Sequence, residues 1–401
     1  MSRTFLRNAV VLGLISAIGP FAIDMYLPAL PTIAEHLQAS TGATQMTLMA
    51  FFITFGICQI VYGPVSDMVG RKPPLYFGLA VYILGSAGCA FAPSIGWLIA
   101  FRALQGIGAS AVMVIPRAII RDLHTGVEGA RLMALVMLVL SVSPILAPLT
   151  GSALIVPFGW RAVFVAVTVV ALLSVGLLAT LLPETLPAEN RVRLQAASLT
   201  RGFGTLIRDP RFLGLTFIGA LGMGSFFTFL ASASFVYIDH FGLSPTVFSI
   251  AFSVNAIGFI GASQFAAPLG ARLGFPRLIT TSVASYAAVL AVLLAVTLAG
   301  VDSLPVLMVL LLVGFTFMGF VIPTSMVMAL DDHGPIAGMA SALGGTLQML
   351  VGGAMIVVAS LVFDGTVLPM VSIMAGCAFG ALALCVPALK ARSATEASAA
   401  E

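Results

Sequence analysis

Twelve long apolar stretches run through this sequence and constrain its fold more than any other feature. A helix that crosses a bilayer needs about 20 consecutive, mostly apolar residues, and these stretches meet that requirement. Cutting the chain at its loop signals predicts spans at residues 9–31, 45–66, 74–92, 95–117, 131–156, 160–182, 211–238, 246–269, 277–299, 305–330, 338–361 and 368–389. The expected fold is therefore an all-α membrane protein with twelve transmembrane helices.

The composition agrees with that expectation and excludes a soluble protein. Of the 401 residues, 60% are hydrophobic and only 8% are charged, whereas soluble domains carry about 25% charged residues. The net charge of +3 is too small to indicate a nucleic-acid partner. The lipid bilayer is the partner that the composition predicts.

One long polar stretch divides the chain into two sets of six spans. It lies between spans six and seven and contains several arginines and glutamates. We predict an N-terminal six-helix bundle at residues 1–182, a cytoplasmic linker at 183–210, a C-terminal six-helix bundle at 211–390 and a tail at 391–401. Duplicated six-span halves are typical of secondary transporters, which bind substrate near the membrane midplane between the halves.

The basic residues predict the orientation of the chain in the membrane. Of its 18 Lys and Arg residues, all but Arg102 and Arg161 fall on one side. Basic residues accumulate on the cytoplasmic side of membrane proteins. Both termini and the central linker are therefore expected to be cytoplasmic.

One acid, Asp24, lies inside the first span, where a charge is costly and usually paired. Asp24 and Arg102 are each about seven residues from the outer edge of their spans, a depth of roughly 10 Å at about 1.5 Å of rise per residue. We predict that the two residues pair, with Asp24 as the protonation site of a transporter. The alternative is that Asp24 only fixes helix packing or lies at the interface beside Tyr26 and Pro28.

This pairing suggests a coupling mechanism. The proton affinity of a carboxylate rises when it loses water and falls beside a guanidinium. If the contact with Arg102 forms in one conformation and breaks in the other, the proton affinity of Asp24 changes between them. An antiporter needs such a change.

The loop after span two carries a glycine- and charge-rich pattern, Gly-x-x-x-Asp-x-x-Gly-Arg-Lys. Its residues are Gly63, Asp67, Gly70, Arg71 and Lys72. We expect Asp67 to accept a hydrogen bond from the helix N-terminus at residues 334–338, where partial positive charge collects. A solvated loop with basic anchors is the alternative. The pattern resembles the first signature of the major facilitator superfamily.

The resemblance extends over most of the chain. Residues 98–110 look like the span-four signature of proton-coupled facilitators, with Arg102, Gln105, Gly106 and Gly108. Residues 140–152 are similar to the span-five antiporter signature, with Pro144, Pro148 and Gly151, but Ala147 and Ser152 replace two of its glycines. The two prolines are interpreted as a kink beside small residues, either structural or a point at which the helix bends between states.

Two further runs narrow the resemblance. Residues 24–31, Asp-Met-Tyr-Leu-Pro-Ala-Leu-Pro, and residues 338–343 look like the Bcr/CflA branch of twelve-span drug:proton antiporters. The resemblance implies the major facilitator fold, a monomer in a bacterial inner membrane, and drug export. It also implies protons as the coupling ion, with no other cofactor.

The superfamily fold implies a substrate cavity lined by spans one, four, seven and ten. The candidate substrate-binding residues are Tyr26, Met113, Phe226, Phe227, Tyr237, Asn255 and Gln348. The 18 Met and 28 Phe residues of the chain favour an adaptable pocket for varied amphipathic small molecules. For any single aromatic residue, core packing or lipid contact is the alternative.

Proton-coupled export of lipophilic small molecules is the leading hypothesis, with no catalytic residues and no metal site. A facilitator for one metabolite, such as a sugar or an amino acid, is the alternative. A polytopic membrane enzyme is a remote one, because the 4 His residues are scattered. We interpret His333, beside Asp331 and Asp332, as part of a solvated loop, since no second His or Cys lies close by to complete a metal site.

Overall fold

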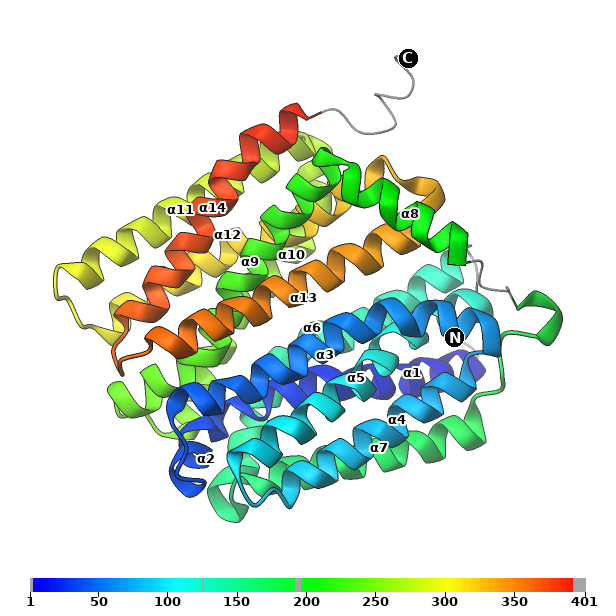
Figure 1. Ribbon diagram of the computed structural model, residues 1–401, viewed down its shortest axis with the longest axis horizontal. Coiled ribbons are helices and arrows are strands. Elements are labelled where there is room, and N and C mark those ends of the chain that lie inside the picture. Colours follow the sequence, from blue (N-terminus) through cyan, green and yellow to red (C-terminus); the bar gives the residue numbers. More distant parts are fainter. Residues whose placement is uncertain (1–2, 125, 192–195, 392–401) are drawn as a thin grey trace. The chain divides into compact units, whose positions relative to one another are not determined.

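The computed structural model describes residues 3–124, 126–191 and 196–391, and the regular structure within these ranges is helical (Figure 1). Twelve helices in them are long and apolar enough to cross a membrane. The predicted twelve-span, all-α architecture is thereby confirmed. The predicted boundaries are within a few residues of the observed ones, apart from the first span, the end of span four and the start of span five.

The chain divides into two compact units, the first made of Met1–Leu194 with Ser244–Ile250 and the second of Gln195–Leu243 with Ala251–Glu401. The helices before the division are α1 (Arg3–Asp24), α2 (Leu30–His36), α3 (Thr41–Val69), α4 (Lys72–Ala90), α5 (Ile95–Leu123), α6 (Gly126–Phe158) and α7 (Arg161–Leu181). Those after it are α8 (Ala196–Arg208), α9 (Pro210–Ser234), α10 (Pro245–Leu273), α11 (Phe275–Leu298), α12 (Leu304–Asp331), α13 (Ala337–Val362) and α14 (Leu368–Lys390).

The two units repeat one packing pattern. In the first, α1 packs on α5, α6 and α7, while α4 packs on α5 and α7; in the second, α9 packs on α12, α13 and α14, while α11 packs on α12 and α14. Glycines make an equivalent close approach in each. A Cβ on Gly106 would lie 2.4 Å from the carbonyl oxygen of Phe51, and one on Gly319 would lie 2.3 Å from that of Phe259. The two sets of six spans are therefore a structural repeat.

The first span is broken where the sequence predicted one continuous segment. Helix α1 ends at Asp24, and a short 3-10 turn at Leu27–Ala29 leads into α2. Pro28 has no amide hydrogen, so it cannot donate the helical bond to the carbonyl of Asp24, four residues back. The break places Asp24 at a helix end. Span seven is also irregular at its corresponding end, where α9 passes into a π-helical turn at Phe235–His240.

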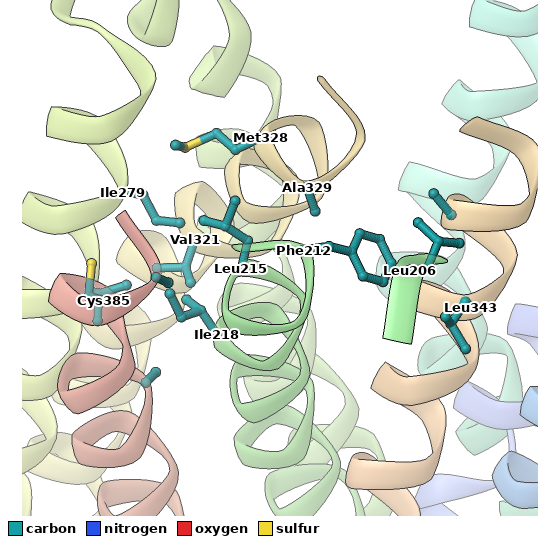
Figure 2. Packing of buried hydrophobic residues seen from close by; sticks show 14 residues of the cluster. Leu206, Phe212, Leu215, Ile218, Ile279, Val321, Met328, Ala329, Leu343 and Cys385 are labelled. Carbon is teal, nitrogen blue, oxygen red and sulfur yellow. The ribbon is translucent and has the colours of Figure 1, made fainter. Parts of the chain in front are cut away.

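Helix α8 joins the core of the second unit. It packs against the ends of α9 and α13 (Figure 1). Figure 2 shows Phe212 of α9 pointing toward Leu206 of α8, with Leu343 of α13 beside them. Leu206 is fully buried. The stretch predicted as a linker thus contains a helix that is packed against its own bundle.

Candidate functional site

The candidate site of the first unit begins at the carboxyl end of α1. Asp24 is the last residue of that helix and is 6% exposed. Ala22, two residues earlier, turns its backbone carbonyl toward α5. This carbonyl accepts a hydrogen bond of 3.0 Å from Nη1 of Arg102. Spans one and four therefore face each other at the level of the two buried charges.

Arg102 is fully buried, and neutral groups surround its guanidinium. Nη1 also donates to Oε1 of Gln105 at 2.5 Å. The guanidinium carbon lies 4.7 Å from the ring centre of Tyr26 and 4.5 Å from that of Phe51. Aromatic faces attract a cation through their negative quadrupole. Two partners of the buried Arg102 guanidinium are thus aromatic rings. Its Nε and Nη2 make no hydrogen bond among the described residues.

The predicted ion pair between Asp24 and Arg102 is not formed in this structure. Both residues lie in the described part of the chain, and the salt bridges found there do not join them. Arg102 reaches the backbone of α1 instead of the carboxylate. Arg102 thus contacts α1 at Ala22, two residues before the buried Asp24. The Asp24 carboxylate does not neutralise the guanidinium.

Side chains from α3 and α4 complete this site, and the sequence did not single them out. Gln105 donates from Nε2 to Oγ of Ser86 at 2.7 Å, which orients its carbonyl oxygen toward Arg102. The Tyr26 hydroxyl lies 2.8 Å from Oγ1 of Thr47, and this bond holds the ring that faces Arg102. The sequence signal that could have found Ser86 and Thr47 is that each is a polar residue inside an apolar span.

The signature loop after α3 forms a tight ionic network within the first unit. Arg71 donates to the carboxylate of Asp67 and to Ser66, and its Nε and Nη2 donate to both oxygens of Asp122 at 2.7 and 3.2 Å. Bidentate pairing of this kind fixes the guanidinium plane. Gly70 has φ of 101°, a conformation that favours glycine. Asp67 is therefore paired inside its own loop, and its predicted contact with residues 334–338 stays a prediction.

Glu184 closes the amino end of α4. Its carboxylate accepts from the backbone N–H groups of Arg71 at 2.9 Å and Lys72 at 3.0 Å, and Lys72 donates from Nζ to the carbonyl of Leu182. Burial raises the pKa of Glu184, but these and two further backbone N–H donors hold the pKa below its usual value. Glu184 and Asp122 were not predicted to belong to this network.

The signature glycines make close helix contacts. A Cβ on Gly108 would lie 2.4 Å from the carbonyl oxygen of Gly78, and one on Gly151 would lie 2.3 Å from that of Met25. Gly63 has more room, with Val114 at 3.9 Å. Helix α6 continues through Pro144 and Pro148, so the bend predicted there stays a prediction.

The candidate substrate residues fall into separate clusters. In the second unit, Phe226 stacks on Phe259 and packs against Phe227 and Phe315. Phe315 continues to Phe229, which packs against Tyr237. Phe259 and Phe315 were not among the predicted cavity residues. One aromatic network thus links Phe226, Phe227 and Tyr237.

The polar candidates have defined neighbours. Asn255 lies beside the Tyr237 hydroxyl. A Cβ on Gly219 would lie 3.0 Å from Nε2 of Gln348, so α13 and α9 meet closely at that amide. Met113 belongs to the first unit, where its Cγ would lie 3.3 Å from a Cβ on Gly19 of α1. Met113 thus packs on the same helix as Asp24.

The interpretation of His333 as a solvated residue is wrong. His333 is 4% exposed, and its Nε2 lies 3.2 Å from Oδ2 of the buried Asp209. The adjacent Asp332 pairs with Arg211 at 3.3 Å. The partners come from the start of α9, far away in sequence, and they cover His333 and part of Asp332, while Asp331 is exposed. Within the described residues no His, Cys, Asp and Glu cluster could hold a metal ion.

Comparison with known proteins places these features in a family context. The sequence profile of the Major Facilitator Superfamily matches residues 12–357. The chain is 36% identical to an uncharacterised MFS-type transporter of Bacillus subtilis, over 92% of each chain. It is 30% identical to a bicyclomycin resistance protein homolog of Haemophilus influenzae, again over 92% of each, and 29% identical to multidrug resistance protein D of Escherichia coli, over 86% of each.

Solved structures of low sequence identity share the fold. A bacterial homolog of the human lysosomal transporter Spinster superposes with a TM-score of 0.75 at 14% identity, covering 97% of this chain and 96% of that one. The xylose transporter XylE of Escherichia coli superposes with a TM-score of 0.71 at 14% identity, covering 98% and 99%. Both likenesses concern the fold alone.

Proposed function

The chain belongs to the Major Facilitator Superfamily, and from that premise we propose that it exports amphipathic, drug-like small molecules in exchange for protons. It is a multi-pass membrane transporter, and its relatives include proteins named for bicyclomycin and multidrug resistance. Membership of the Bcr/CflA drug-efflux branch is consistent with those relatives. A monomer in a bacterial inner membrane completes the proposal.

The buried guanidinium of Arg102 without a bound carboxylate is the observation that carries this proposal. A buried cation interacts strongly with any nearby anion, because little water screens the pair. Asp24 is the acid of the helix that Arg102 already contacts. A neutral, protonated Asp24 fits an arrangement in which carbonyl oxygens and aromatic rings are the partners of the guanidinium.

Deprotonation of Asp24 would change which groups the Arg102 guanidinium contacts. The new carboxylate would attract the guanidinium, which would then leave the carbonyl of Ala22 or draw the end of α1 closer to α5. Either movement alters how the two helices pack. Proton release and conformational change are coupled in this way, since each state of Asp24 favours a different contact of Arg102.

The aromatic network of the second unit suits the proposed cargo. Phe226 is half-buried and stacked on Phe259, and the polar Asn255 and Gln348 lie on neighbouring elements. Apolar rings with a few amide groups bind amphipathic molecules without demanding one shape. Sugars need a denser set of hydrogen-bonding groups, so drug-like compounds fit these residues better.

The test uses the purified full-length protein in liposomes with an imposed pH gradient. Internal pH is followed while lipophilic cations, neutral lipophilic drugs, sugars and amino acids are added one at a time. We expect drug-like compounds to provoke proton movement and sugars and amino acids to provoke none. Proton movement with a sugar or amino acid alone would replace drug export by metabolite transport, and no movement with any compound would end the antiport proposal.

The variant Asp24→Asn tests the coupling itself. Asparagine keeps the size of the side chain and removes the proton exchange. We expect the variant to fold and to lose proton-driven export. Asp364→Asn is the matched control, because Asp364 is an exposed acid whose partner is Thr366 in its own loop. Undiminished export by Asp24→Asn would contradict the proposed role.

A further inference from the structure

A groove runs between α1 and α7 of the first unit, away from the site described above. Its volume is about 350 Å³. The residues that line it are Leu6, Arg7, Val10, Val11, Leu177 and Leu181. Five of the six are aliphatic and one is a cation, so the groove combines the two chemistries of a phospholipid.

The aliphatic part of the groove opens to the outside of the unit. Leu6 and Val10 are more than half exposed, and a Cβ added to the neighbouring Gly176 would meet nothing within 4 Å. In a bilayer such a surface faces hydrocarbon. The groove is open on this side, so hydrocarbon chains of the bilayer can enter it and contact the atoms that line it. An acyl chain of a membrane lipid is the available filler.

The cationic part lies at one end of the same groove. Arg7 is exposed and takes part in none of the ion pairs found among the described residues. A second cation lies close to the end of α7, where Nζ of Lys72 is 2.8 Å from the carbonyl of Leu182, the residue after Leu181. The nearby Glu184 carboxylate accepts from backbone N–H groups. Arg7 is therefore the unpaired cation at this end of the groove.

We propose that this groove is a binding site for an anionic phospholipid, with its acyl chain between α1 and α7 and its phosphate on Arg7. Basic side chains beside an intramembrane groove bind anionic headgroups, since the phosphate neutralises a guanidinium that is otherwise unpaired. Arg7 lies at the end of α1 that the distribution of basic residues predicts to be cytoplasmic. The lipid would come from the inner leaflet.

This proposal does not depend on what the protein transports. A lipid at this position covers the amino-terminal half of α1, the helix that ends in Asp24. It would therefore stabilise the packing of α1 on α7. The effect is measurable on the resting protein, without any substrate or pH gradient.

The experiment is a lipid titration of the full-length protein in detergent, followed by native mass spectrometry. Phosphatidylglycerol is compared with phosphatidylcholine of the same chains. We expect phosphatidylglycerol to be retained at least about tenfold more tightly, a difference of about 1.4 kcal/mol. Equal retention of the two lipids would overturn the headgroup assignment.

Two variants locate the site. Arg7→Gln is expected to lower the affinity for phosphatidylglycerol to that for phosphatidylcholine, and Val10→Trp, which fills the groove, is expected to lower the retention of both. Arg272→Gln removes an exposed arginine at the end of α10 and is the matched control, with no expected change. Thermal unfolding without added lipid confirms that each variant is folded. Unchanged phosphatidylglycerol binding in Arg7→Gln and Val10→Trp would refute the site.

Discussion

The guanidinium of Arg102 donates to the backbone carbonyl of Ala22 at 3.0 Å, and this bond joins α5 to the end of α1. A planar guanidinium lies against two aromatic rings while its Nη1 serves this carbonyl and Gln105, whereas an ammonium is a compact point charge with no plane to stack on them. We therefore expect Arg102→Lys to keep the positive charge and yet lose proton-driven export by at least about tenfold. Export by proteoliposomes under a pH gradient is the measurement.

A second variant separates positioning from charge. Gln105→Leu leaves Arg102 in place but removes the acceptor that orients it. We expect intermediate export, with a shifted dependence on internal pH, because the guanidinium gains freedom to approach Asp24. If Arg102→Lys and Gln105→Leu both export at the wild-type rate, the contacts around Arg102 have no role in transport.

The contact between Gly108 and α4 predicts a strong effect of a single methyl group. A Cβ on Gly108 would lie 2.4 Å from the carbonyl oxygen of Gly78 and 2.4 Å from the amide nitrogen of Tyr82. Both atoms belong to backbone and cannot turn away. We expect Gly108→Ala to destabilise the protein by about 1–3 kcal/mol, measured as a lower Tm in detergent.

Gly176→Ala is the control for that substitution. It also adds one methyl group to a helix, but at a position with nothing within 4 Å. We expect no loss of Tm. A similar Tm for Gly108→Ala and Gly176→Ala would mean that the close approach of α4 and α5 is easily relieved.

The sequence predicts the twelve spans because bilayer thickness sets a length that apolar runs either reach or fail to reach. The position of Arg102 opposite the end of α1 was also accessible, since rise per residue converts sequence distance into depth. The break after Asp24 was missed, although Pro28 lies four residues later. The break has a local cause, Pro28, but the apolar run was interpreted as one continuous span.

Contacts between distant segments were not accessible from the sequence. Asp122 pairs with Arg71 across 51 residues, and His333 finds Asp209 in another part of the chain. A polar triplet such as Asp331-Asp332-His333 looks solvated when its partners are unknown. The aromatic rings beside Arg102 were equally hidden, because a Phe in an apolar span has no signal that separates a lipid contact from a cation contact.

The ionic network around Glu184 makes a prediction about pH. The Glu184 carboxylate accepts hydrogen bonds from backbone N–H groups, and these bonds hold its pKa below the usual value of about 4.3. A carboxyl with a lowered pKa stabilises the folded state above its unfolded pKa, and this contribution disappears as pH falls through its folded pKa. The wild type should therefore exceed Glu184→Gln in Tm at pH 7.

That difference should shrink as the pH is lowered below about 4.3, since Glu184 of the wild type then takes up a proton. Thermal unfolding in detergent is recorded for both proteins between pH 7 and pH 3. Using the difference removes the contributions of Asp67 and Asp122, which both proteins share. A gap in Tm that stays constant across this range would show that the charge of Glu184 is not what stabilises the loop.

The buried pair of His333 and Asp209 predicts a graded loss of stability. Asp209 accepts from the backbone N–H groups of Arg211 at 2.8 Å and Phe212 at 3.0 Å, so it caps α9 and also holds His333. Loss of the cap costs about 1–2 kcal/mol, and a buried imidazole without an acceptor adds about 1–3 kcal/mol. Asp209→Ala is therefore expected to lower the Tm more than Asp209→Asn, whose amide oxygen still caps the helix. Asp364→Ala, at an exposed acid of the same unit, should change the Tm little, and equal Tm values for Asp209→Ala and Asp364→Ala would contradict the pairing.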